Sequence, residues 1–246
     1  MQHQNLDYNK TVSEIVRSDY RAADVFKKHG INYCCSGQVM LQEACEVRQI
    51  SYDQVVEELD VATRSMRLPN SLQFSEWKMD FLADYITNVH HAYLYKMLPD
   101  LSNRVTSFIE GHKKKFPELE EMQSIFNDLS RILLMHMPLE DEIIFPYIKQ
   151  IEATYRRNEP YGQLFVRTLR KPLGGVEKVH EEISTLLKQL KVNSNNFNFP
   201  SNACTNHQVV YHKLREFYDD MIQHMHLEHN ILYPKVIETE EYLLGK

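Results

Sequence analysis

The stretch His136-Met-Pro-Leu-Glu140-Asp-Glu-Ile-Ile-Phe-Pro146 occurs a second time in this chain in modified form. The second copy, 88 residues further along, is His224-Met-His-Leu-Glu228-His-Asn-Ile-Leu-Tyr-Pro234. The His, Met, Leu, Glu, Ile and Pro positions match in register. Self-similarity at a fixed offset indicates a duplicated structural unit. We therefore expect the helices around the first copy to be echoed around the second.

A lone histidine precedes each copy at nearly the same distance. His91 lies 45 residues before His136, and His180 lies 44 residues before His224. Each half of the long helical region thus contributes one lone histidine and one His-X-X-X-Glu. Two long helices in each half predict a four-helix bundle.

The His-X-X-X-Glu spacing suits metal binding. Residues four apart lie one turn from each other on one helix face, so each copy presents a nitrogen and a carboxylate to the same point. A single such pair is more often found at the surface, and the duplication makes the pattern specific. Burying these groups without partners would cost on the order of several kcal/mol per ion, which bound metal would remove. The predicted metal ligands are His91, His136, Glu140, His180, His224 and Glu228.

The donor types indicate which metal is bound. Two histidines for each ion, with Glu140 and Glu228 bridging the pair, suit iron or manganese better than tetrahedral zinc. Five or fewer protein contacts for each ion leave room for an oxo or hydroxo bridge and a small exogenous molecule. We expect two iron ions per chain, bridged by carboxylates and by an oxo or hydroxo group.

Other histidines are excluded from this ligand set. His90 points about 100° away from His91 on a regular helix, so only one of them is expected to face the core, and the repeat favours His91. His112 lies 21 residues after His91, roughly 31 Å along a continuous helix. With the three lysines that follow it, His112 predicts a solvated helix end.

Helical patterns run through the whole chain. Only 7 of the 246 residues are glycine, and no convincing alternating strand is present, so the sequence predicts an all-α protein. Four long helices are expected at about 75–110, 117–152, 160–192 and 205–239. Pro138 fits poorly, because proline inside a helix removes a hydrogen bond.

The first 65 residues predict a small separate helical domain. Capping patterns at Thr11-Val-Ser-Glu14 and Ser51-Tyr-Asp-Gln54 open two helices, and the first should run to Gly30. A short helical stretch from about 38 to 47 lies between them. We expect this domain over 1–65, a linker over 66–75 and the bundle over 76–246.

The adjacent cysteines Cys34 and Cys35 form a second candidate site. They precede a predicted helix, whose N-terminus would favour the thiolate form. A disulfide between neighbours is strained and would act as a labile switch, whereas two small buried residues in a tight turn are the alternative. Cys45 is expected in the core, and no partner is indicated for Cys204.

Charge and hydropathy exclude several classes of partner. The chain has 28 basic and 34 acidic residues, a formal net charge of −6, which argues against nucleic-acid binding. No segment approaches the ~20 apolar residues that cross a bilayer, and the N-terminus does not read as a secretory signal. We expect a cytoplasmic protein without a membrane partner, in which the cysteines are thiols, ligands or redox groups rather than structural disulfides.

The segment Ile31-Asn-Tyr-Cys-Cys-Ser-Gly37, followed by a bundle with six predicted ligands, resembles the ScdA-like repair-of-iron-centres family. In that family an ScdA-type N-terminal domain precedes a hemerythrin-like domain, and the resemblance covers essentially the whole chain. It implies that the six residues correspond to the family's iron ligands, and Cys34 and Cys35 to its cysteine pair. Ser36 replaces the first glycine of the family's usual Cys-Cys-Gly-Gly pattern, and serine tolerates positive φ less well than glycine.

The resemblance also implies a function. Such proteins repair iron-sulfur clusters damaged by nitric oxide or oxidants, and this chain would supply iron from its di-iron centre as a donor rather than as an enzyme. Its partners would be damaged or apo iron-sulfur proteins, and Cys34 and Cys35 would receive iron, dock the recipient or supply reducing equivalents. A homodimer is compatible with a small N-terminal domain on a linker, without being indicated.

Two other functions remain open. One is reversible binding or sensing of oxygen or nitric oxide at a hemerythrin-like site. The other is reduction of nitric oxide at the two irons. The second would need electrons from another protein, because the sequence shows no flavin or nicotinamide fingerprint.

Overall fold

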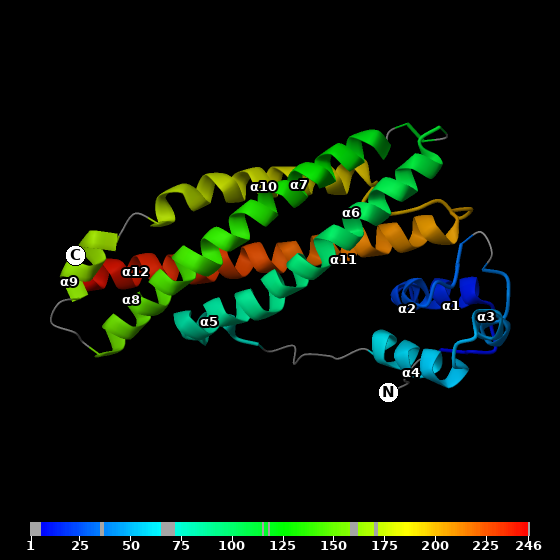
Figure 1. Cartoon of the computed structure of the whole chain (residues 1–246). Helices are drawn as coiled ribbons and strands as arrows, with labels where there is room; N and C mark the ends of the chain where they lie inside the picture. Colours follow the sequence, from blue (N-terminus) through cyan, green and yellow to red (C-terminus); the bar gives the residue numbers. More distant parts are fainter. Residues whose placement is uncertain are drawn as a thin grey trace. The chain divides into compact units, whose positions relative to one another are not determined.

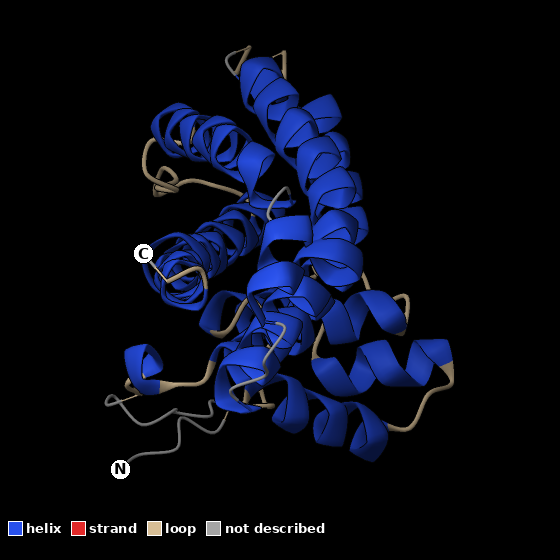
Figure 2. Ribbon diagram, turned by 90° about the vertical axis from the view of Figure 1, so that its left-hand side faces the viewer, coloured by secondary structure: helices blue, strands red, loops and turns tan. Residues whose placement is uncertain are grey.

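The computed structural model describes residues 6–34, 37–64, 72–114, 116–117, 119–157, 162–169 and 172–245. Over these ranges the regular elements are helices, and the one β-contact is an isolated bridge between Thr11 and Met40 (Figure 2). The prediction of an all-α protein, with a small helical domain ahead of a helix bundle, is confirmed. No helix within the described ranges is both long and apolar enough to span a bilayer.

The chain divides into two compact units. The first comprises Met1–Pro69 with Phe197–Arg215, and the second comprises Asn70–Asn196 with Glu216–Lys246. The last long helix therefore contributes its first turns to the first unit and the rest to the second. The boundary expected at 66–75 stays a prediction, and it did not anticipate the segment 197–215 in the first unit.

The first unit begins with four short helices. Their bounds are α1 (Val12–Ser18), α2 (Ala22–Lys28), α3 (Leu41–Arg48) and α4 (Tyr52–Thr63). Thr11 caps α1 with both bonds of a capping box, and Ser51 accepts a bond from the Gln54 amide at the start of α4, as predicted. The single helix expected up to Gly30 is wrong. The chain leaves the helical region at Asp19 (φ −149°, ψ 111°), which ends α1 before α2 begins.

An apolar core holds the first unit together. Ile15, Phe26, Leu41 and Leu59 are fully buried in it, and Val209 from the last long helix packs into the same cluster. An ion pair and a ring stack join residues 197–215 to α2 and to Tyr20, which precedes α2. Lys213 Nζ lies 2.7 Å from Asp24 Oδ2, and the His212 ring stacks on Tyr20 with centroids 5.0 Å apart. These contacts explain why residues 197–215 belong to this unit.

The second unit is built from four long helical stretches (Figure 1). A short turn, η1 (Phe74–Glu76), precedes them. The first three stretches are α5 (Met79–Tyr85), η2 (Ile86–His91) and α6 (Ala92–His112); α7 (Leu119–Leu139), η3 (Glu140–Ile144) and α8 (Phe145–Arg157); and α9 (Gly162–Leu169), η4 (Pro172–Gly175) and α10 (Val176–Asn193). The fourth is α11 (Thr205–Leu227), η5 (Glu228–Leu232) and α12 (Tyr233–Leu243), of which the part from Glu216 belongs to this unit.

Apolar faces pack these stretches against one another. The helix α7 lies against α6 and α10, and α8 lies against α5 and α12 (Figure 1). Leu82, Ile86, Ile148, Leu227 and Val236 are fully buried in one cluster. The third stretch was expected as one helix over 160–192. It is interrupted instead by the 3₁₀ turn Pro172–Gly175, whose proline and glycines disfavour a regular helix.

Three of the four stretches contain a widened π turn, at Ile86–His91, Glu140–Ile144 and Glu228–Leu232. In η3 and η5 the amide of the following residue bonds to the carbonyl of Glu140 or Glu228, five residues back. Prolines follow both turns and have no N–H to continue the ordinary ladder. Such π turns are rare in proteins overall but are often found at functional sites. All three turns here include a predicted ligand. Nothing in the structure explains Pro138, which lies inside α7.

Candidate metal centre

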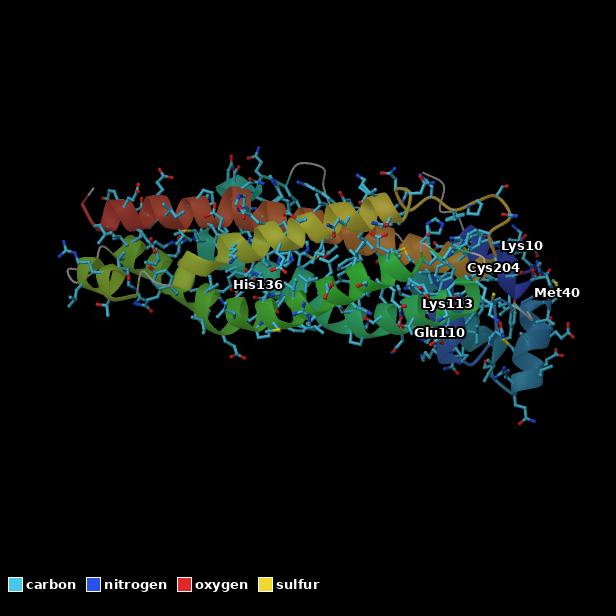
Figure 3. All side chains as sticks on the ribbon, turned by 90° about the horizontal axis from the view of Figure 1, so that it is seen from above. Lys10, Met40, Glu110, Lys113, His136 and Cys204 are labelled. Atoms are coloured by element: carbon cyan, nitrogen blue, oxygen red, sulfur yellow. The ribbon has the colours of Figure 1, made fainter. Side chains whose placement is uncertain are left out.

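The six predicted ligands come from every stretch of the second unit and are all buried. None of their side chains is more than 5% exposed. The ligand from η2 is His91, α7 and η3 contribute His136 and Glu140, α10 contributes His180, and α11 and η5 contribute His224 and Glu228. Figure 3 shows His136 about midway along the length of the bundle, away from its ends. The local spacing that predicted these residues thus corresponds to one buried cluster.

The four histidines form two pairs with their Nε2 atoms facing. His91 Nε2 lies 3.1 Å from His224 Nε2, and His136 Nε2 lies 2.8 Å from His180 Nε2. Each pair joins a lone histidine to a motif histidine from the other half of the chain. Two ring nitrogens whose lone pairs point at each other at this distance repel, so a proton or a cation is needed between them.

Each glutamate directs one oxygen toward each histidine pair. Glu140 Oε1 lies 3.0 Å from His136 Nε2, and its Oε2 lies 3.5 Å from His91 Nε2. Glu228 Oε1 lies 2.9 Å from His224 Nε2, and its Oε2 lies 3.5 Å from His180 Nε2. This placement is what a carboxylate that bridges two cations requires.

The unsatisfied atoms of the cluster indicate that its donors fit metal ions. Among the described residues, Glu140 Oε2 and Glu228 Oε2 are buried and have no hydrogen-bond partner. A buried carboxylate oxygen without a partner is costly, and a bound cation would remove that cost. Two groups of residues could each hold a metal ion, because the ligand atoms within each group all lie within 4.8 Å of one another. One group is His91, Glu140, His224 and Glu228, and the other is His136, Glu140 and His180. The two groups share the Glu140 carboxylate.

Electrostatics within the cluster keep the carboxylates ionised. Burial opposes the charge of Glu140, but His136, His180 and His91 outweigh it and hold the pKa of this carboxyl well below its usual range. Burial lowers the pKa of His91, whereas Asp141 and the two glutamates raise it, and the balance places the pKa at about 11. Ionised carboxylates are the form that binds a cation.

Asp141 is a functional residue that sequence reasoning missed. Its Oδ1 lies 2.8 Å from His91 Nδ1 and accepts a bond from Thr87 Oγ1 at 2.8 Å. Tyr95 donates its hydroxyl to the other oxygen at 3.3 Å. A carboxylate on the outer nitrogen fixes the tautomer and the ring orientation of a metal-binding histidine. The repeat could not reveal Asp141, because the second copy has His229 at the aligned position.

His90 is buried as well, which corrects the expectation that only one of the adjacent histidines faces the core. Its Nδ1 lies 2.9 Å from Asp220 Oδ1, and its ring stacks on His224 with centroids 5.5 Å apart. His90 therefore packs against α11 while His91 faces the cluster. His90 belongs to neither group of ligand atoms.

Two aromatic rings cover the cluster at equivalent positions of the repeat. Phe145 stacks on His91 with centroids 5.5 Å apart, and Tyr233 stacks on His180 at 5.8 Å. The Tyr233 hydroxyl also donates to Glu140 Oε1 at 2.6 Å. Burial and the two glutamates raise the pKa of Tyr233 well above its usual value, so the phenol remains a donor. Phe145 and Tyr233 occupy the same position in the two copies of the repeat, but nothing in the sequence indicated that the Tyr233 hydroxyl bonds to Glu140.

A pocket of about 170 Å³ reaches the cluster from the surface. His180 and Tyr233 line its inner part, and the exposed residues Glu177, His229 and Ile237 line the rest. The pocket gives a small molecule or an ion a path to the edge of the cluster.

The cysteine pair is described only in part. The Cys34 amide donates to Asn32 Oδ1 at 2.9 Å, and its side chain is partly exposed, whereas Cys35 and Ser36 lie outside the described residues. The helix expected from about 38 begins at Leu41. Cys45 is buried in the core of the first unit as expected, and burial raises the pKa of its thiol. The role of the pair stays a prediction.

Comparison with family models identifies the bundle. Residues 82–236, well over half of the chain, match the model described as the hemerythrin HHE cation binding domain. The chain belongs to the hemerythrin HHE family. Residues 8–63 match the ScdA_N model, described as a domain of unknown function. This pair of matches confirms the resemblance to the ScdA-like family, and the HHE match includes all six predicted ligands.

Curated relatives cover nearly the whole chain. An iron-sulfur cluster repair protein, YtfE, from Escherichia coli O157:H7 is 27% identical over an alignment of 235 residues that covers 94% of this chain and 98% of the relative. Proteins of the same name from Escherichia coli O81 (strain ED1a) and Enterobacter sp. (strain 638) are 27% and 26% identical over the same coverage. This hemerythrin HHE protein therefore shares both of its units with them.

Proposed function

We propose that this hemerythrin HHE protein holds two iron ions in its bundle and supplies iron for the repair of damaged iron-sulfur clusters. The observation that carries the proposal is the placement of Glu140 and Glu228, each with one oxygen toward each histidine pair. The printed names of the relatives, which match nearly the full chain, support the repair role.

The residues divide into two sets of ligands that share the glutamates. His91 and His224 would hold one ion, and His136 and His180 would hold the other. Iron bound at this site would be the store from which a damaged or incomplete iron-sulfur cluster takes up iron. Hard carboxylate oxygens together with imidazoles favour iron over softer metals that prefer thiolates.

Neighbouring residues fix and shield these ligands. Asp141 holds the His91 ring with its Nε2 toward the cluster. The rings of Phe145 and Tyr233 stack on His91 and His180, and both histidines are buried. Ligands held in this way bind a cation tightly, so that transfer depends on an acceptor or a reductant.

Cys34 and Cys35 would act at the receiving end. Thiolates are soft ligands for iron and are the ligands of iron-sulfur clusters. We propose that the pair accepts iron or docks the recipient protein. The recipients would be apo or damaged iron-sulfur proteins.

The proposal is tested by metal content and by transfer. The full chain, loaded anaerobically with ferrous iron and desalted, should hold two irons, and a His136→Ala, His224→Ala variant should hold none. The matched control is His226→Ala, an exposed histidine within the second motif. Loaded protein should then rebuild the cluster absorbance of an apo ferredoxin supplied with sulfide. A loaded protein that transfers no iron would contradict the repair role.

Binding of oxygen or nitric oxide is a second candidate function, favoured by the pocket that reaches His180 and Tyr233. It predicts a reversible change in the optical spectrum when the gas is added and removed. It also predicts that iron stays on the protein when the apo ferredoxin is present. Sustained consumption of nitric oxide with an electron donor would instead indicate reduction at the site.

A further inference from the structure

The two aromatic rings that stack on the cluster differ by one hydroxyl group between the halves of the bundle. Phe145 follows Glu140 by five residues, and Tyr233 follows Glu228 by five. Each ring stacks on a predicted ligand, His91 or His180. The stacking is shared, but only Tyr233 carries a polar group.

The hydroxyl bonds to one particular oxygen of a shared ligand. Tyr233 donates to Glu140 Oε1 at 2.6 Å, and both side chains are buried. Glu140 Oε1 is also the oxygen nearest to His136, at 3.0 Å from Nε2. Glu140 Oε2, toward His91, has no hydrogen-bond partner among the residues that the structure describes. The phenol therefore acts on the side of Glu140 that faces the His136 and His180 pair.

The hydroxyl and an ion held by His136 and His180 would compensate the same carboxylate oxygen. An ionised carboxylate in a buried site is costly unless a donor or a cation offsets its charge. With an ion in place, the ion supplies most of that compensation and the hydrogen bond adds little. Once the ion has left, the hydrogen bond is the remaining compensation at Oε1 besides the imidazoles. The bond is thus worth more to the metal-free protein than to the loaded protein.

We propose that Tyr233 is a positioning residue that stabilises Glu140 when iron leaves the His136 and His180 pair, and thereby eases iron release. This inference rests on the proposed function and adds a residue that tunes it. Since Phe145 offers no hydroxyl at the equivalent position, the effect belongs to one half of the site.

The first test is the rate of iron loss from the full chain. Wild type and Tyr233→Phe are loaded anaerobically with ferrous iron and mixed with an excess of a ferrous chelator. A hydrogen bond to a charged group predicts roughly 10-fold slower loss from the variant. The matched control is Tyr147→Phe, which removes a buried phenol that donates to Glu240, outside the cluster. The control should lose iron at the wild-type rate.

The second test measures thermal stability with and without iron. Tyr233→Phe should lower the midpoint of the metal-free protein more than that of the loaded protein, so that iron stabilises the variant more than it stabilises wild type. Tyr147→Phe should lower both midpoints equally. Equal loss rates for wild type and Tyr233→Phe, faster loss from the variant, or an equal drop of both midpoints would overturn the inference.

A reciprocal variant keeps the inference testable if Tyr233→Phe does not fold. Phe145→Tyr adds a hydroxyl at the position that the repeat aligns with Tyr233, and it should speed iron loss. Unchanged loss from this variant, together with unchanged midpoints, would count against the inference. If wild type takes up no iron, the proposed function fails. If wild type holds two irons and Tyr233→Phe loses them at the wild-type rate, only the inference fails.

Discussion

Nδ1 of His91 lies 2.8 Å from Oδ1 of Asp141, so the residue next to a predicted ligand in sequence holds a different ligand in space. Within the described residues, the outer nitrogens of His180 and His224 have no hydrogen-bond partner. The two halves of the repeat are similar in sequence, yet the hydrogen bonds that support their histidines are unequal. Compared with His180 and His224, His91 therefore has its orientation fixed by a carboxylate.

Asp141→Asn should weaken metal binding without removing a ligand. Loss of the carboxylate on the outer nitrogen of a ligating histidine lowers metal affinity roughly 10–100-fold. The measurement is competition for ferrous iron against a chelator of known affinity. Asp128→Asn, at an aspartate whose side chain is half exposed and paired with Arg131, is the control. Wild-type affinity in Asp141→Asn would show that the bond does not support the site.

Glu140→Gln should reduce the iron content below two per chain, because the lost carboxylate faces both histidine pairs. An amide presents one neutral oxygen and one nitrogen, so it cannot bridge two cations as a carboxylate does. Iron is counted by elemental analysis after anaerobic loading and desalting. The control is Glu142→Gln, an exposed residue of the same π turn. Two tightly bound irons in Glu140→Gln would rule out the bridging role.

Acid should destabilise the first unit through Glu58. The Nζ of Lys28 and Nε2 of His29 lie 2.8 and 2.9 Å from its carboxylate and lower the pKa of Glu58 from 4.5 to about 2. A depressed pKa means that this stabilisation is complete above pH 4.5 and is lost as pH falls toward 2.

Glu58→Gln should therefore flatten the dependence of stability on pH between 4.5 and 2. Melting of the metal-free full chain, followed by circular dichroism at several pH values, measures this effect. Glu57→Gln, at the exposed neighbouring residue, should keep the wild-type slope. The same slope in both variants would mean that the ion pairs of Glu58 do not form in solution.

Val209→Ala should destabilise the first unit, although position 209 lies far from it in sequence. The Val209 side chain is 1% exposed and packs in the core of that unit. Removing two buried methyl groups costs about 2 kcal/mol. Denaturant unfolding of the full chain measures the loss, and Val192→Ala, at an exposed valine, should cost nothing measurable. Equal stability of the two variants would place residue 209 outside the core.

A Cys34→Ser, Cys35→Ser double variant should keep its iron but transfer it poorly. The six predicted ligands of the bundle do not include these cysteines, so the iron content should stay at the wild-type level. The apo ferredoxin assay then reports transfer alone, with Cys204→Ser as the control for loss of a partly exposed thiol. Wild-type cluster repair by the double variant would rule out a role for the pair in receiving iron.

The sequence by itself determined the helical class, the caps at Thr11 and Ser51 and the six residues of the cluster. These features depend on local geometry, because residues four apart share a helix face whatever lies around them. The helix breaks at Asp19 and within Pro172–Gly175 were missed because tertiary contacts and turn chemistry decide where a helical pattern stops.

Only the tertiary structure decided which histidines face each other, that Asp141 supports His91 and that Tyr233 bonds to Glu140. It also decided that both His90 and His91 are buried and that Val209 completes the core of the first unit. Each of these contacts joins residues at least 44 positions apart, or depends on which way a helix is rotated against its neighbours. Helical periodicity fixes the face on which a side chain lies, but packing between helices fixes what that face meets.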